Sequence, residues 1–174
     1  LYRPLGRLLI NNKTHSTDYQ DLMQYRVHEI LLIASDYDSY ILEEDGRLTE
    51  QILTEYIGMN LSYAPRLWNA STASDAMQML DQKSFDLIIV MLRISDMNPI
   101  KLSKKIKKSY PEKPIILLVF DESELSHLPS NYSKTIDNIF IWSGDASVFP
   151  AIIKYIEDKV NVERDTKVGD VRSI

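Results

Sequence analysis

The sequence contains no cysteine, only three histidines and no long hydrophobic run. Without cysteine, disulfides, thiolate catalysis and thiolate metal sites are excluded. His15, His28 and His127 are far apart, so a histidine metal cluster is not expected. The longest apolar runs, such as that from Ile115 to Phe120, are much too short to span a membrane. The sequence also lacks a GxGxxG nucleotide motif and a GxSxG hydrolase motif.

Basic residues are outnumbered by acidic ones, 20 to 25, which gives a formal net charge of −5. A nucleic-acid-binding domain needs a basic surface to neutralise phosphates, so the charge argues against that class. The length of 174 residues and the hydrophobic fraction of 44% are typical of one globular domain with some additional chain. Because the chain begins with leucine and has no signal peptide, we expect a piece of a longer cytoplasmic protein.

Five short segments are predicted to be strands of a parallel sheet. Four are nearly continuous runs of Ile, Leu and Val, typical of strands covered on both faces: 29–35, 85–91, 113–120 and 138–143. The fifth segment, 65–70, is more polar and opens with proline, which is typical of an edge strand.

Helical patterns alternate with these strands. Apolar residues recur at helical spacing over 72–81, 99–109 and 147–160, and a weakly marked helix precedes the last strand. The stretch 37–60 is also helical in pattern, but EEDG at 43–46 interrupts it, which indicates a bent helix or a short insertion. The alternation predicts right-handed crossovers and a parallel sheet with helices on both faces.

The pattern divides the chain into three parts. Residues 1–26 have no strand signal and are predicted to form an N-terminal arm with a short helix near Asp18–Tyr25. Residues 27–161 form the domain. Residues 162–174 are charged and then turn apolar, which is typical of a linker into a following domain. Residues 161–170 are expected to fray or to extend as a helix that pairs elsewhere.

Residues 28–160 resemble the receiver domain of bacterial response regulators. The stretch NASTASDAMQMLDQKSFDLIIVMLRISDMNPIKLSKKIKK is similar to the second helix, third strand, loop and third helix of that family. KPIILLVF is similar to its fourth strand and IDNIFIWSGD to its fifth. The resemblance implies an α/β three-layer αβα sandwich, flavodoxin-like, with a five-stranded parallel sheet of order 2-1-3-4-5.

In that family, an acidic pocket at the carboxyl ends of the strands binds Mg²⁺ and accepts a phosphoryl group on an aspartate. The resemblance places the acidic pair at Ala34 and Ser35, the phosphoacceptor at Met91, the hydroxyl at Val119, the lysine at Trp142 and the aromatic switch position at Ile139. None of these side chains can do the family's chemistry, because a thioether is not phosphorylated and offers no hard oxygen ligand.

The resemblance therefore implies a non-catalytic pseudo-receiver with no cofactor and no metal. Its expected partners are proteins: an adjacent receiver, a kinase region of the same polypeptide, or a second copy, but neither nucleic acid nor membrane. YDSYILEEDGRL at 37–48 and IKYIEDKVNVERDTKVGDV at 153–171 are similar to degenerate receivers in proteins with a phosphoenolpyruvate synthase or pyruvate phosphate dikinase-like region.

Two alternatives stay open. One is an active but atypical receiver, phosphorylated on a relocated Asp36 or Asp96, although both are also explained as solvated loop acids, with Asp36 capping the next helix. The other is a small-ligand sensor at the switch point of the sheet, with Trp142 as a wall.

A possible interaction face is indicated by Phe140, Trp142, Lys101 and Lys105. Lys101 and Lys105 belong to a five-lysine helix that also contains Lys104, Lys107 and Lys108. These lysines suit an acidic partner, although a solvated helix face is the more common explanation of such a run. Because tryptophan is enriched at binding hot spots, Trp142 is interpreted as filling the pocket that the missing acidic residues leave, or as an anchor for a partner. Simple core packing explains Trp142 equally well.

Overall fold

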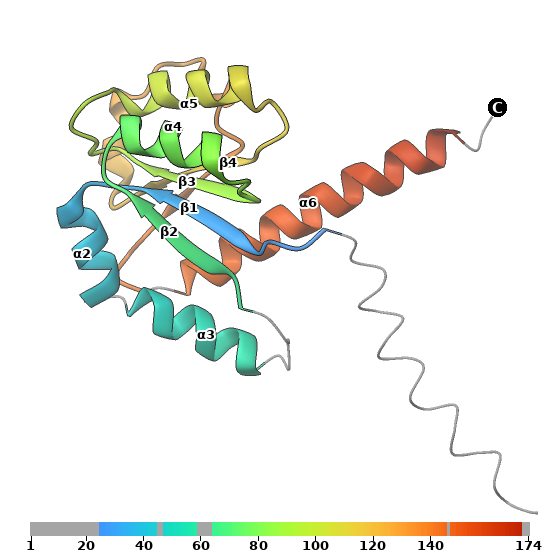
Figure 1. Ribbon diagram of the computed structural model, residues 1–174, viewed down its shortest axis with the longest axis horizontal. Coiled ribbons are helices and arrows are strands. Elements are labelled where there is room, and N and C mark those ends of the chain that lie inside the picture. Colours follow the sequence, from blue (N-terminus) through green and yellow to red (C-terminus); the bar gives the residue numbers. More distant parts are fainter. Residues whose placement is uncertain (1–24, 45–46, 59–63, 146, 172–174) are drawn as a thin grey trace, which may run out of the picture. The chain divides into compact units, whose positions relative to one another are not determined.

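The computed structural model describes residues 25–44, 47–58, 64–145 and 147–171 (Figure 1). The predicted N-terminal arm, including its helix near Asp18–Tyr25, lies outside the described residues except for its last two residues. Val27–Ile156 form one unit, which contains the sheet. Tyr25, Arg26 and the chain from Glu157 onward belong to a second unit.

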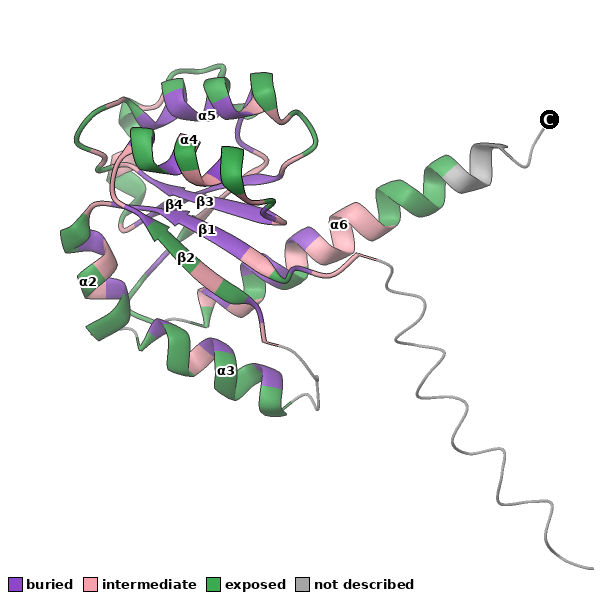
Figure 2. Ribbon diagram, viewed as in Figure 1, coloured by how far each residue is buried: buried purple, intermediate pink, exposed green. Residues whose placement is uncertain are grey.

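The sheet has five parallel strands in the order β2-β1-β3-β4-β5, as predicted. The strands are β1 (Glu29–Ile33), β2 (Arg66–Ala70), β3 (Leu87–Met91), β4 (Ile115–Val119) and β5 (Asn138–Ile141). β3 and β4 are buried over their whole length, whereas the edge strand β2 is mostly exposed (Figure 2). The apolar runs thus mark the three central strands. The prediction that 138–143 is covered on both faces is wrong, because β5 is the other edge strand and its residues are half-buried or exposed.

Helices cover both faces of the sheet. They are α2 (Asp36–Glu44), α3 (Leu48–Gly58), α4 (Ala73–Gln82), α5 (Pro99–Ser109) and α6 (Val148–Val171). α4 and α5 lie over one face, and α2, α3 and the first part of α6 lie over the other (Figure 1). The flavodoxin-like three-layer sandwich is therefore confirmed.

The predicted helix over 37–60 is two helices. α2 ends at Glu44, and α3 starts after Arg47, whose φ of 47° lies in the left-handed region. A left-handed residue cannot continue an α-helix, so the chain turns there. Each helix then buries its own stripe, Leu48, Ile52 and Tyr56 in the case of α3.

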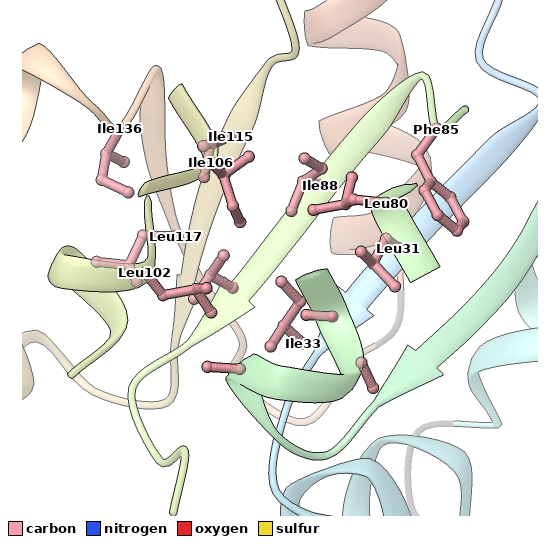
Figure 3. Close-up of a cluster of buried hydrophobic side chains, with 14 of the residues drawn as sticks. Leu31, Ile33, Leu80, Phe85, Ile88, Leu102, Ile106, Ile115, Leu117 and Ile136 are labelled. Atoms are coloured by element: carbon pink, nitrogen blue, oxygen red, sulfur yellow. The ribbon is translucent and has the colours of Figure 1, made fainter. Parts of the chain in front are cut away.

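A cluster of buried side chains joins α4 and α5 to the sheet (Figure 3). Alternate residues of each central strand belong to it, such as Leu31 and Ile33 of β1, because successive strand side chains point to opposite faces. Leu80 of α4 and Leu102 of α5 pack against them. The intervening strand residues are equally buried and face the other helical layer.

The connection between β4 and β5 contains two 3₁₀ turns, η1 (Glu122–His127) and η2 (Tyr132–Lys134), in place of the weakly marked helix. Asp121 caps η1 by accepting a bond from the Ser123 N–H, 2.6 Å away. No residue of either turn is buried. With no apolar stripe to bury, this segment has little to gain from a full helix.

In the second unit, the side chain of Asn161 pairs with both backbone groups of Tyr25. Its Oδ1 accepts the Tyr25 N–H at 2.9 Å, and its Nδ2 donates to the Tyr25 carbonyl at 3.1 Å. The guanidinium carbon of Arg164 lies 5.2 Å from the centre of the Tyr25 ring. These contacts connect the described start of the chain to the middle of α6.

Candidate functional site

The carboxyl ends of β1, β3, β4 and β5 form one edge of the sheet. Ala34, directly after β1, continues the strand ladder by donating its N–H to the Ala70 carbonyl at 3.1 Å. Ile33 pairs with Val90, so Ala34 stands one step further on, opposite Met91. Met91 is 1% exposed and Ala34 is fully buried. The middle of this edge is therefore dry and apolar.

Met91 and Val119 end neighbouring strands but face opposite layers. Val119 belongs to the core cluster under α4 and α5, together with Leu117. Met91 alternates with Ile88 and Val90, which belong to that cluster, and so it points to the side of α2 and α6. The two side chains therefore belong to different layers of the core.

Trp142 follows β5 and packs inside this edge. Its N–H donates to the Val119 carbonyl at 2.8 Å, and its side chain is 7% exposed. Its ring stands edge-to-face on Phe120, with the ring centroids 5.2 Å apart. The indole Nε1–H has no hydrogen-bond partner among the described residues.

An ion-pair group lies at the same edge, and the sequence analysis did not identify it. Arg93 lies two residues beyond β3, and its guanidinium contacts Asp38 of α2 at 3.4 Å and Glu124 of η1 at 3.5 Å. The same guanidinium lies 5.5 Å from the centre of the Phe120 ring. We call Arg93, Asp38 and Glu124 the arginine clamp. It ties together the segments that follow β1, β3 and β4.

Backbone hydrogen bonds reinforce the clamp. The Ser35 N–H donates to the Arg93 carbonyl at 3.0 Å, which fixes the segment after β3 to the segment after β1. The second carboxylate oxygen of Glu124 accepts the Phe120 N–H at 2.9 Å. Arg93 is thus held by its main chain and its side chain together.

Asp38 is completely buried, and burial raises the pKa of its carboxyl above the ordinary value. Ser35 and Arg93 oppose that shift, while the nearby charge of Glu124 adds to it. Oδ2 of Asp38 has no hydrogen-bond partner among the described residues. One positive charge therefore serves two carboxylates, one of them strongly desolvated.

Weak signals for the clamp exist in the sequence. Asp38 stands three residues after Ser35, and this spacing is typical of a helix N-terminus. The Ser35 Oγ accepts the Asp38 N–H at 3.1 Å, so Ser35 caps α2. The suggestion that Asp36 is the cap is therefore wrong, because Asp36 is already the first helical residue. Nothing local links Asp38 to Arg93.

Solved structures of receiver domains match this chain. The signal receiver domain of an HD domain-containing protein from Pseudomonas fluorescens Pf-5 is 24% identical, with a TM-score of 0.60, over 81% of this chain and 94% of its own. A receiver domain protein from Clostridium thermocellum is 16% identical, with a TM-score of 0.60, over 78% and 98%. The response regulator TrrA from Thermotoga maritima, in complex with Mg²⁺-BeF, is 17% identical, with a TM-score of 0.52, over 74% and 98%.

The chain has the fold of a response-regulator receiver domain. No protein-family model matches the sequence, and no curated protein matches it. Among the described residues, no helix is both long and apolar enough to cross a membrane.

Asp36 and Asp96 are the two candidates for a relocated phosphorylation site on this receiver fold. Both oxygens of Asp96 accept bonds from the start of α4, from the Ala73 N–H at 2.7 Å and the Ser74 N–H at 3.1 Å. The bond from Ala73 is the main reason why the pKa of Asp96 is lowered. Asp36 is exposed at the start of α2. Asp96 therefore has a structural role as a helix cap.

The described part of this receiver fold contains no group of three or more His, Cys, Asp or Glu side chains suited to a metal ion. A cavity of about 270 Å³ opens beside the clamp, between the segments after β3 and β4. Leu92, Asn98, Ile100, Glu124, His127 and Leu128 are among the residues that line it. Trp142 is not part of this lining, so it does not form a wall of this cavity.

The structure does not gather the four residues of the possible interaction face. Phe140 packs on Tyr155 of α6, with ring centroids 5.7 Å apart, and Trp142 is buried. Lys101 and Lys105 are exposed on α5, which covers the other face of the receiver sheet. The two lysines alone remain a candidate surface.

Proposed function

We propose that this domain is a pseudo-receiver, a regulatory and protein-interaction module of a two-component signalling protein that does not accept a phosphoryl group. The supporting observation is the burial of Met91 at the end of β3, the position that corresponds by resemblance to the phosphoacceptor. Ala34 and Val119 extend the apolar character to the neighbouring strand ends. A buried thioether and two aliphatic side chains offer neither a nucleophile nor a ligand for Mg²⁺.

The arginine clamp supports the same proposal. A divalent cation at this edge would need at least two carboxylates free to converge on it. Asp38 and Glu124 instead share the guanidinium of Arg93, and the backbone binds a second oxygen of Glu124. We infer that the chain supplies its own counter-ion here. Such a domain is expected to hold one conformation and to signal through contacts with proteins.

We also propose the kind of protein to which this domain belongs. We place the domain in a cytoplasmic, multidomain phosphorelay-type protein, next to a receiver or kinase region, in a polypeptide with a phosphoenolpyruvate synthase-like part. Residues 162–174 would link it to that neighbour. Its exposed residues 162–167 lie on the continuous helix α6, which supports a helical rather than a flexible link.

Titration with Mg²⁺ and beryllofluoride tests the central claim. The TrrA regulator was solved with Mg²⁺-BeF and serves as the positive control. For this domain we expect no saturable heat with Mg²⁺ at up to about 10 mM, with or without beryllofluoride. A saturable signal that Asp36→Asn or Asp96→Asn abolishes would overturn the proposal in favour of the atypical active receiver.

The cavity beside the clamp favours a second candidate, a small-ligand sensor. Its lining combines apolar side chains with Asn98, Glu124 and His127, a composition common in small-molecule sites. A fragment screen followed by amide chemical shifts would test it. Binding that shifts residues after β3 and β4 would support a sensor, and an absence of hits would count against it.

A further inference from the structure

Helix α5 concentrates positive charge on an otherwise acidic protein. Five of the chain's 20 Lys and Arg residues lie within its 11 residues, which include no Asp or Glu. Lys107 has a structural role, since its Nζ donates to the Lys113 carbonyl at 2.7 Å and pairs with Asp137 at 2.9 Å. For the other four lysines, no side-chain hydrogen bond or ion pair to a described residue is found.

These four lysines, Lys101, Lys104, Lys105 and Lys108, form what we call the lysine stripe. Their spacing of i, i+3, i+4 and i+7 places them on one side of α5, and all four are exposed. The buried residues of the helix, including Leu102 and Ile106, lie on the opposite side. The stripe is thus a continuous, solvent-facing row about 10 Å long.

The stripe is electrostatically unfavourable in the isolated domain. Lys101 and Lys105, and likewise Lys104 and Lys108, are like charges one helical turn apart, which destabilise a helix. Lys101 also lies in the first turn, where the helix dipole disfavours a cation. None of the four forms an ion pair with any described residue. An acidic partner would relieve all of these repulsions at once.

We propose that the lysine stripe is a docking site for an acidic protein segment, a helix with Asp or Glu at the matching spacing. The inference rests on the proposed role as an interaction module, but it does not depend on the loss of phosphoryl transfer. Complementary charge at this site would make binding fast and sensitive to salt.

Other occupants fit the stripe less well. Exposed large apolar residues occur on α2, α3, β2, β5 and α6 in the described chain, but not on α5, so α5 has nothing to insert into a membrane or to stack on bases. The net charge of −5 repels a polyanion beyond the stripe itself. A second copy could offer acidic α2, but α2 covers the opposite face of the sheet from α5. Such contacts would be heterologous and would not close into a dimer.

The test uses the full chain and two double variants with equal net charge. Lys104→Gln with Lys105→Gln removes the middle of the stripe. Lys134→Gln with Lys167→Gln removes two exposed lysines elsewhere. The probe is an alanine-based helical peptide with four glutamates at i, i+3, i+4 and i+7, titrated at low salt while amide chemical shifts are recorded.

We expect shifts along α5 and a Kd that rises about tenfold or more in the stripe variant, but less than about twofold in the control variant. The stripe variant should also melt higher than the parent at low salt, with the difference disappearing near 1 M salt. Equal weakening by both variants would overturn the proposal. Tighter binding of a single-stranded oligonucleotide than of the peptide would overturn it in favour of nucleic acid. The Mg²⁺ and beryllofluoride titration is independent of either result.

Discussion

Met91 lies at the end of β3 with its side chain enclosed by the α2 and α6 layer. A carboxylate at this place would lose most of its hydration. Among the described residues, the cation at this edge is Arg93, which already pairs with Asp38. We expect Met91→Asp to lower the free energy of unfolding by about 2–4 kcal/mol, the cost of a buried and poorly paired acid. Urea denaturation at neutral pH measures the change.

Met91→Leu is the matched control, because it keeps the volume and the apolar character and should cost less than about 1.5 kcal/mol. If Met91→Asp unfolds at the same urea concentration as the parent, Met91 is not at the bottom of a dry site. The assignment of Met91 to the phosphoacceptor position would then be wrong.

Asp38 gives the domain a dependence on pH. Burial raises its pKa in the folded state, so the folded protein keeps this proton to a higher pH than the unfolded chain does. The stability associated with the protonated form is complete below the ordinary aspartate pKa and is lost as pH rises through the raised pKa. Asp38→Asn cannot ionise. We therefore expect the stability of this variant relative to the parent to increase as pH rises above about 4 and through the raised pKa of Asp38.

Unfolding measured across that range checks the sign of the effect. Met91→Leu, which changes no ionisable group, serves as the control and should run parallel to the parent. Parallel curves for Asp38→Asn as well would mean that Asp38 titrates alike in both states. Burial is the main cause of the raised pKa of Asp38, and Ser35, Arg93 and Glu124 are the neighbouring groups that modify the size of the shift.

Among the elements, α5 depends strongly on its first turn. Asn98 caps it, with Oδ1 accepting the Ile100 N–H at 2.9 Å and the Lys101 N–H at 3.2 Å, and Pro99 occupies the next position. Asn98→Ala should cost about 1 kcal/mol, because these two amides lose their acceptor. Asn98→Asp keeps the acceptor and adds a charge that the helix dipole favours, so it should match or exceed the parent.

Chemical denaturation of both Asn98 variants decides the point. An alanine variant as stable as the parent would show that water replaces the cap at no cost. The cap stabilises the start of α5 and so offsets part of the repulsion among the lysines that follow it.

At the scale of the whole molecule, α6 is divided between the two units. It belongs to the unit that contains the sheet up to Ile156 and to the second unit from Glu157. Its stripe of Phe149, Ile152, Ile153 and Ile156 is buried, whereas residues 162–167 are exposed. A helix with no packing of its own is marginal in water. In the isolated chain we therefore expect amide hydrogen exchange to become fast beyond Asn161, and in a longer protein with the neighbouring domain we expect protection over 161–170.

Hydrogen exchange on both forms, at concentrations where the chain is monomeric, tests this expectation. Strong protection of 161–170 in the isolated chain would show that the segment is stabilised without a neighbour. It would then be no linker, and the proposed link to a neighbouring domain would fail.

The sequence alone was sufficient to predict the strands and the helices α4 and α5. The reason is that burial on two faces requires continuous apolar runs such as 115–119, and burial on one face requires helical spacing such as Leu102 with Ile106. A local signal also lies at the start of α4, where Thr72 is the cap and the Asp75 N–H donates to its hydroxyl at 3.0 Å. The strand order came from the resemblance to receivers.

The tertiary structure alone decided the contents of the strand-end edge. Asp38 and Arg93 are 55 residues apart, and nothing in either neighbourhood indicates the other. They meet because parallel strands bring their carboxyl ends to one edge, whichever residues follow them. Likewise, Met91 and Val119 both read as apolar strand ends, and only the register of β3 against β4 separates them onto opposite faces. Local sequence patterns determined which residues are buried. The pairing of strands that are distant in the sequence determined which charged side chains share a site.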